Sequence, residues 1–173
     1  MVTVEAGSRS DYRELAVIAS AQVLALGTWF AASAAAPALR AEWHLSGAEV
    51  PLLTTAVQVG FVVGALTSAF LNLPDRLYPP HLMSGGALGA ALCTAAFALF
   101  AHGVWVAAGL RLLTGICLAL VYPVGLKLAS SWFLDRRGWA LGVLVGALTL
   151  GSTLPQLVGG SFGSAWRPAL GVA

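Results

Sequence analysis

Charged residues are scarce in this sequence. Only 9% of its 173 residues are Asp, Glu, Lys or Arg, whereas a soluble domain carries about a quarter. Hydrophobic residues make up 58% of the chain, and the mean hydropathy is +0.85. Because lipid cannot hydrogen-bond the backbone, only helices and closed barrels span a bilayer, and the long uninterrupted apolar runs favour helices. We therefore expect an all-α, polytopic membrane helix bundle that lies within a lipid bilayer.

Basic clusters and cysteines are scarce as well. The net charge is only +2, and the chain has no basic block, so nucleic acid is not expected as a partner. The two cysteines, Cys93 and Cys117, both lie in apolar runs. We expect them to be small buried thiols rather than a disulfide or a metal site, and we expect no cofactor.

Five apolar runs are long enough to cross a bilayer, which takes about 20 residues of helix. The predicted spans are Leu15–Leu39, Val50–Leu73, His81–Ala101, Val104–Leu126 and Trp139–Gly160. We expect residues 1–14 to form a polar N-terminal segment and residues 15–173 to form one transmembrane domain. The first run exceeds the roughly 7–15 apolar residues of a signal peptide, so we expect it to remain as a helix. Ser46 and Glu49 predict a capping box before the second span.

The placement of Lys and Arg predicts the orientation of the bundle, because cytoplasmic loops are enriched in them. With the N-terminus inside, six basic residues lie in inner segments and two lie in outer ones. The inner residues are Arg9, Arg13, Arg76, Lys127, Arg136 and Arg137, and the outer residues are Arg40 and Arg167. We therefore expect a multi-pass protein of the cell membrane with a cytoplasmic N-terminus.

One basic residue, Arg111, lies inside an apolar run. A charged side chain within the bilayer is costly and marks a functional site by default. The guanidinium keeps its proton, so it must meet water, backbone carbonyls, a partner side chain or an anion. No Asp or Glu lies inside any of the five predicted spans, so these helices offer it no carboxylate. The sequence therefore predicts that Arg111 is a functional residue.

Glycines recur at helical spacing in two of the spans. Gly60 and Gly64 are four residues apart, and Gly142 and Gly146 form a second such pair. Small residues at this spacing let membrane helices approach closely. The residues predicted to pack helices are Gly60, Gly64, Gly142, Gly146, Gly151 and Pro155. The third span has almost no polar residues, and we expect it to face lipid.

Two stretches resemble signatures of the major facilitator superfamily of transporters. The stronger is Arg111-Leu-Leu-Thr-Gly115, which resembles the arginine motif of that family's fourth helix, with Thr114 where glutamine is frequent. Leu73-Pro-Asp75-Arg76 resembles the loop between the family's second and third helices. The resemblance implies that Arg111 takes part in energy coupling or proton transfer. It also implies that Asp75 and Arg76 belong to a gating loop.

The last span resembles the family's glycine-rich fifth helix. Gly142 and Gly151 are nine residues apart and Gly159-Gly160 closes the pattern, although Pro155 stands where a glycine is usual. Trp166-Arg167-Pro168 resembles the entry to a sixth helix. The chain therefore resembles the N-terminal half of such a transporter, truncated near the start of helix six.

The resemblance implies a secondary transporter, not an enzyme, that moves a small solute by alternating access. The candidate residues of its path are Gln22, Trp29, Gln58, Arg111 and Tyr122. Arg111 would line this central path, where it would attract an anionic solute or take part in coupling to a proton. A missing C-terminal half would complete the cavity.

Two alternatives to transport remain. The first is a non-transporting membrane partner, or a truncated remnant, that packs through its glycines. The second is an intramembrane serine hydrolase, because Gly159-Gly-Ser161-Phe-Gly163 fits a Gly-x-Ser-x-Gly pattern. That pattern supports catalysis when a strained turn after a strand exposes the serine, whereas here it follows a predicted helix.

Overall fold

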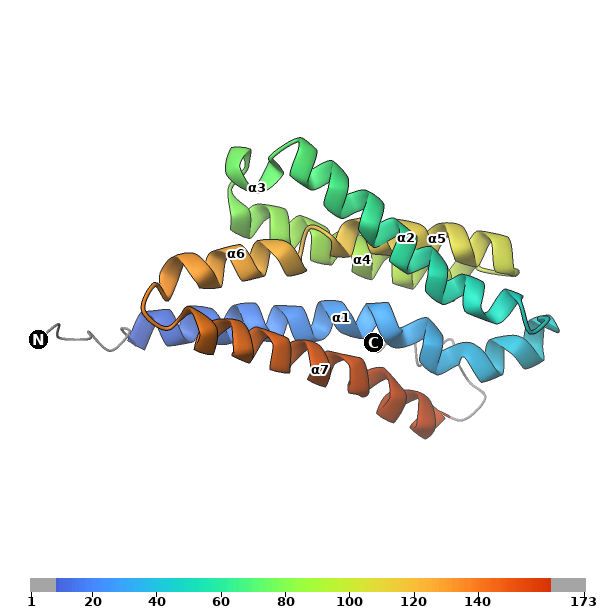
Figure 1. Cartoon of the computed structure of the whole chain (residues 1–173). Coiled ribbons are helices and arrows are strands. Elements are labelled where there is room, and N and C mark those ends of the chain that lie inside the picture. Colours follow the sequence, from blue (N-terminus) through green and yellow to red (C-terminus); the bar gives the residue numbers. More distant parts are fainter. Residues whose placement is uncertain (1–8, 163–173) are drawn as a thin grey trace, which may run out of the picture.

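The computed structural model describes residues 9–162, and these residues form helices and turns without strands (Figure 1). The helices are α1 (Arg9–Trp43), α2 (Glu49–Phe70), α3 (Leu73–Arg76), α4 (Pro79–Phe100), α5 (Val104–Leu118), α6 (Tyr122–Trp132) and α7 (Arg137–Phe162). Residues 1–8 of the predicted N-terminal segment lie outside the described residues, and so does the predicted entry to a sixth helix at residues 166–168. The all-α prediction is confirmed for the part that is described.

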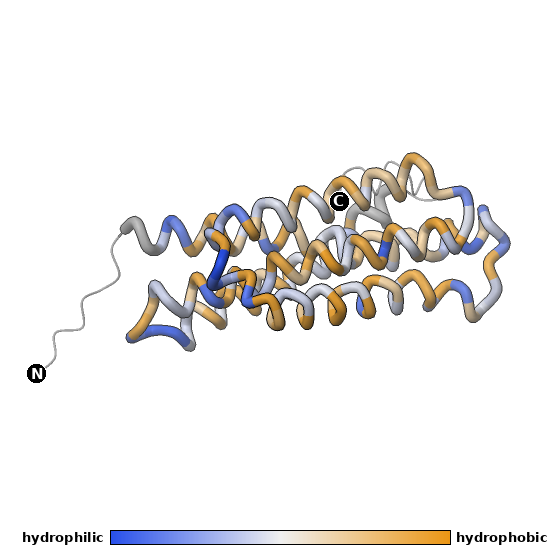
Figure 2. The backbone as a smooth tube through the Cα atoms, turned by 90° about the horizontal axis from the view of Figure 1, so that it is seen from above, coloured by the Kyte–Doolittle hydropathy of each residue, from blue (hydrophilic) through white to orange (hydrophobic). Residues whose placement is uncertain are grey.

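Five stretches of the described chain are long and apolar enough to cross a membrane. They are Tyr12–Trp43, Glu49–Phe70, Pro79–Phe100, Val104–Trp132 and Arg137–Leu157. Most hydrophilic positions gather toward the ends of the bundle and its turns, with hydrophobic positions along the lengths between them (Figure 2). This arrangement is that of a polytopic membrane helix bundle, as predicted.

The fourth predicted span is interrupted. α5 and α6 are separated by residues 119–121, although we predicted one helix over Val104–Leu126. We attribute the interruption to Pro123, which has no N–H to bond the carbonyl of Ala119 and whose ring crowds that carbonyl. Two N–H groups in the gap donate instead to carbonyls three residues earlier, which tightens the turn. The span therefore consists of two helical pieces that meet near its middle.

The first span is longer than predicted. α1 continues past Leu39 to Trp43, where a polar loop was expected from Arg40 onward. His44 then adopts a left-handed backbone with a φ of 51°, and the N–H of Leu45 donates to the carbonyl of Arg40 at 3.2 Å. This is the 6→1 hydrogen bond of a Schellman motif, in which a left-handed residue turns the chain out of the helix. The helix therefore ends where that turn closes, and not at the first polar residue.

Ser46 and Glu49, the predicted capping pair, are in contact at the turn before α2. The backbone N–H of Ser46 donates to Oε2 of Glu49 at 2.8 Å. In a capping box the carboxylate of the third helical residue reaches back to the backbone N–H of the capping residue. Here, however, Glu49 is the first residue of α2 and Ala48 is its N-cap, so the contact closes the turn between α1 and α2 and is not a capping box.

α2 and α5 approach each other through glycines, and we call this contact the α2–α5 seam. A Cβ atom built on Gly60 would lie 2.0 Å from the carbonyl oxygen of Leu112, and one on Gly115 would lie 2.1 Å from that of Val57. A Cβ on Gly64 would also meet the α5 backbone, at 2.8 Å. Apolar surface gains little by leaving lipid for protein, so close backbone packing of this kind supplies much of the attraction between membrane helices.

α4 has one packed face and one exposed face. Ala90 and Phe97 are fully buried. A Cβ on Gly86 would lie 2.7 Å from the carbonyl oxygen of Cys117, near the end of α5. Leu92 and Leu99, by contrast, are more than 60% exposed. The predicted lipid-facing character of the third span therefore fits only one of its faces, because its small residues pack against α5.

Candidate functional site

Arg111 lies on α5 in the interior of the bundle and is only 1% exposed. Its Nη1 donates a hydrogen bond to the carbonyl of Thr28 at 2.7 Å, and its Nη2 donates to the carbonyl of Trp29. Within the described part of the chain, its Nε–H has no hydrogen-bond partner. Backbone carbonyls of α1 therefore compensate the buried cation, which is one of the arrangements that the sequence left open.

We call this arrangement, the guanidinium of Arg111 with the carbonyls of Thr28 and Trp29, the Arg111 clamp. A carbonyl oxygen has two lone pairs, so it can accept from the guanidinium as well as within its own helix. The planar fork of arginine suits two neighbouring acceptors, and hydrogen bonds from a charged donor are roughly twice as strong as neutral ones. The clamp therefore fixes the turn of α1 that carries the ring of Trp29.

A cavity of about 390 Å³ lies beside that turn, and we call it the aromatic cavity. It is lined by Leu26, Trp29, Phe30, Gln58, Phe61, Tyr122 and Leu148. Cavities that take small molecules measure about 300–1,000 Å³ and combine apolar walls with a few polar groups. The lining residues that carry polar groups are Gln58 and Tyr122, and no lining residue is charged. The cavity therefore has the size and the lining of a small-molecule site.

The structure places the predicted path residues in two groups. Trp29, Gln58 and Tyr122 line the aromatic cavity, whereas Gln22 and Arg111 lie within the packed interior, at 0% and 1% exposure. Arg111 and Tyr122 do not lie on one continuous helix, because the chain is interrupted between α5 and α6. Arg111 thus contributes to the cavity through the backbone of α1 and not as a lining side chain.

Gln22 joins α1 to the start of α6. Its Nε2 lies 3.4 Å from the carbonyl oxygen of Tyr122, and its Oε1 has no hydrogen-bond partner among the described residues. A Cβ built on Gly125 would lie 2.1 Å from Nε2 of Gln22, so the absence of a side chain at Gly125 is what leaves room for the amide. Gln22 therefore holds the start of α6, which carries Tyr122, against α1.

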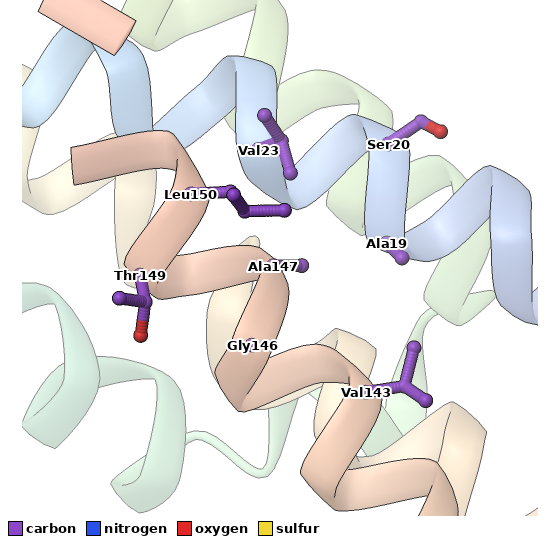
Figure 3. A pocket seen from close by; sticks show the side chains of 8 residues that line it. All are labelled: Ala19, Ser20, Val23, Val143, Gly146, Ala147, Thr149 and Leu150. Atoms are coloured by element: carbon purple, nitrogen blue, oxygen red, sulfur yellow. The ribbon is translucent and has the colours of Figure 1, made fainter. Parts of the chain in front are cut away.

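A second hollow, of about 630 Å³, lies between α1 and α7 (Figure 3). Figure 3 shows Val23 of α1 and Leu150 of α7 directed toward each other across it, with Gly146 on the nearby turn of α7. A Cβ built on Gly142 or Gly146 would meet nothing within 4 Å in the described structure, whereas one on Gly151 would lie 2.8 Å from the carbonyl oxygen of Val23. The two helices thus touch at Gly151, and the other two glycines face open space.

The predicted gating loop is tied to α6. Nζ of Lys127 lies 2.6 Å from Oδ1 of Asp75 and donates to the carbonyl of Pro74 at 2.8 Å. Both charged side chains are well exposed, so the pair is worth at most about 1 kcal/mol. Arg76 is the last residue of α3 in the same loop. The sequence had placed Lys127 only among the basic residues of the inner side, and its partner could not be derived without the fold.

Four lining residues of the aromatic cavity were missed from the sequence, namely Leu26, Phe30, Phe61 and Leu148. Helical spacing carried a signal for two of them. Leu26 precedes Trp29 by three residues and Phe61 follows Gln58 by three, and residues three apart share a helix face. Pairing each predicted polar residue with its apolar neighbours on the same face would have found these two.

The serine motif lies in an unsuitable setting for a nucleophile. α7 runs as a helix through residues 159–162, whereas a Gly-x-Ser-x-Gly nucleophile sits on a strained turn after a strand. The last glycine of the motif, Gly163, lies outside the described residues. The helical backbone gives the hydrolase hypothesis no support.

Five apolar spans in the described part of the chain define a multi-pass membrane protein. The sequence profile of the Major Facilitator Superfamily matches residues 18–173, and the chain belongs to that family. The resemblance drawn from its motifs is therefore confirmed.

Two curated relatives are similar to parts of the chain. The enterobactin exporter EntS of Citrobacter koseri is 40% identical over 84 residues, which cover 49% of this chain and 18% of the relative. The gallate transporter of Pseudomonas putida is 33% identical over 132 residues, which cover 76% of this chain and 28% of the relative. The chain thus matches less than a third of the length of either relative.

Proposed function

We propose that this chain forms one half of a secondary transporter that moves a small solute across the cell membrane by alternating access, with its N-terminus in the cytoplasm. The observation that carries the proposal is the aromatic cavity, whose walls come from α1, α2, α6 and α7. A second half would close it from the other side. Family membership supports this reading, because transporters of this fold bind solute between their repeats near the middle of the bilayer.

The orientation is part of the same proposal. The start of α1, α3, the end of α6 and the start of α7 gather at one end of the bundle (Figure 1). These segments and the turns between them carry all six basic residues expected inside, namely Arg9, Arg13, Arg76, Lys127, Arg136 and Arg137. Cytoplasmic segments are rich in Lys and Arg. Asp75 and Arg76 would then act in a gating loop on the cytoplasmic side.

Within this proposal Arg111 is a positioning residue. Its two terminal nitrogens are bonded to α1, so an anionic solute or a coupling carboxylate would have to displace those carbonyls in order to reach them. By holding the turn of Trp29, the clamp sets the wall of the cavity. Direct anion binding by Arg111 is the competing role. The clamp needs the two-nitrogen fork of arginine, whereas anion binding needs its positive charge.

Gallate is the first solute to test, because the relative whose match covers 76% of this chain is a gallate transporter. Uptake of labelled gallate would be measured in cells that produce the complete transporter, with Arg111 replaced by Lys or by Gln. Lysine keeps the charge but cannot make the bidentate fork. The clamp predicts that both variants raise the KM and lower uptake by about tenfold or more, because each loses a charged hydrogen bond of about 1.5–3 kcal/mol.

Arg136→Gln, at the exposed end of the bundle, is the matched control and should retain uptake when membrane levels are equal. Substantial uptake by Arg111→Lys, but not by Arg111→Gln, would show that charge is sufficient and would replace the clamp by anion binding or coupling. Full uptake by Arg111→Gln would contradict both roles. Absence of gallate uptake in the unaltered protein would exclude gallate as the solute. The Arg111 variants would then be compared with the unaltered protein on other solutes.

A further inference from the structure

The aromatic cavity points to one class of solute. We infer that it binds a single planar aromatic ring that is uncharged or anionic, and that it discriminates against saturated rings and against cations. This inference rests on the proposed function only in treating the cavity as a solute site.

Aromatic rings dominate the walls. Trp29, Phe30, Phe61 and Tyr122 all line the cavity, and the centroids of Trp29 and Phe61 are 5.2 Å apart with their planes at 70°. Aromatic pairs prefer such edge-to-face packing at about 4.5–7 Å. An edge-to-face pair gives an entering ring both a face to stack on and an edge to approach. A saturated ring of similar size could only pack its C–H groups against these faces, because it has no π-system with which to stack.

The size of the cavity fits a substituted ring. An engineered apolar cavity of about 150 Å³ is large enough to bind benzene, and this cavity measures about 390 Å³. The remaining volume allows polar substituents on the ring. Gln58 offers an amide that can donate and accept, and Tyr122 offers a hydroxyl that can do the same. These groups would satisfy such substituents and fix the direction of the ring.

The charge of the surroundings excludes one competing occupant. Aromatic walls also suit organic cations, which lie over ring faces. Here, however, the lining includes no carboxylate, and the buried cation of Arg111 is bonded to the carbonyl of Trp29, one of the wall residues. Because this positive charge is held against the turn of α1 that carries Trp29, it repels a second cation in a medium of low dielectric constant. The same charge favours an electron-rich or anionic ring.

The test is equilibrium binding to the full chain in lipid nanodiscs, with binding to empty nanodiscs subtracted. The probes are benzoate, cyclohexanecarboxylate of the same charge, and benzyltrimethylammonium of the opposite charge. We expect benzoate to bind about tenfold more tightly than either of the other two. Trp29→Leu and Phe61→Leu should each weaken benzoate binding by about 2- to 12-fold, since an aromatic contact contributes about 0.5–1.5 kcal/mol.

Trp29→Phe keeps a ring and should retain the preference for benzoate, and Phe100→Leu replaces an exposed ring outside the cavity and should have no effect. Equal binding of benzoate and cyclohexanecarboxylate would overturn the inference, and so would tighter binding of the cation. A ring preference that survives both Trp29→Leu and Phe61→Leu would overturn its placement in this cavity. Because the assay measures binding, a ring-selective site without uptake would contradict only the proposed transport.

Discussion

The helices of the α2–α5 seam and α7 all carry glycines, but only at the seam do several glycines face the backbone of the partner helix. At Gly60 and Gly115 the facing backbone lies so close that a single added carbon would overlap it. Along α7, Gly151 touches α1, whereas Gly142 and Gly146 face open space, and Gly146 lines a hollow of about 630 Å³. A glycine thus permits close approach, but whether another helix uses the opening depends on the rest of the fold.

The most direct test of this difference is to add one methyl group to a glycine of the seam and one to a glycine that faces open space. Gly60→Ala places a Cβ against the α5 backbone and should destabilise the bundle by about 1–3 kcal/mol, the usual cost of overpacking. Gly146→Ala places the same group in open space and should be neutral or slightly stabilising, because alanine favours helix over glycine. Unfolding by sodium dodecyl sulfate in mixed micelles, followed by circular dichroism, measures both.

Equal free energies of unfolding for the two alanine variants would contradict the distinction between a closed and an open glycine face. A large loss of stability in Gly146→Ala alone would reverse it. Gly115→Ala, which meets the α2 backbone from the other side of the seam, repeats the first measurement with the partner helix.

Gly151→Ala sharpens the comparison with a smaller expected effect. A Cβ there would lie 2.8 Å from the carbonyl oxygen of Val23, a contact that is tight but less severe than the 2.0 Å at Gly60. The neighbouring α1 also borders the hollow, so it has room to yield. We expect a loss of about 1 kcal/mol in the same unfolding assay. A loss larger than that of Gly60→Ala would show that α1 and α7 are held more rigidly than this account allows.

Much of the architecture could be predicted from the sequence because hydropathy and length are local properties. The five spans and the family follow from apolar runs and from the motif around Arg111. The interruption near Pro123 could also have been predicted, since proline removes a helical N–H. The apolar run continues through it, however, so hydropathy alone predicted one helix. The end of α1 depended on a left-handed turn at His44, which no hydropathy pattern marks.

The site could be predicted only in part, because its central contact joins distant segments. The sequence singled out Arg111 and left carbonyls among its candidate partners, yet it could not choose the carbonyls of Thr28 and Trp29, which lie over 80 residues away in the chain. It also could not separate Trp29, which lines the cavity, from Gln22, which is buried behind it. Both share one polar helix face, and only the packing of α6 divides them.

The central claim is that the guanidinium of Arg111 is bonded to the backbone of α1, and solid-state NMR in lipid bilayers tests it most directly. With 15N in the arginine side chains and 13C in the carbonyl of Thr28, rotational-echo double resonance reports the distance between them. The account predicts clear dephasing from a direct N–H···O=C contact, consistent with the 2.7 Å between Nη1 and the carbonyl oxygen. Absence of dephasing, with a hydrated guanidinium that exchanges readily with water, would contradict it.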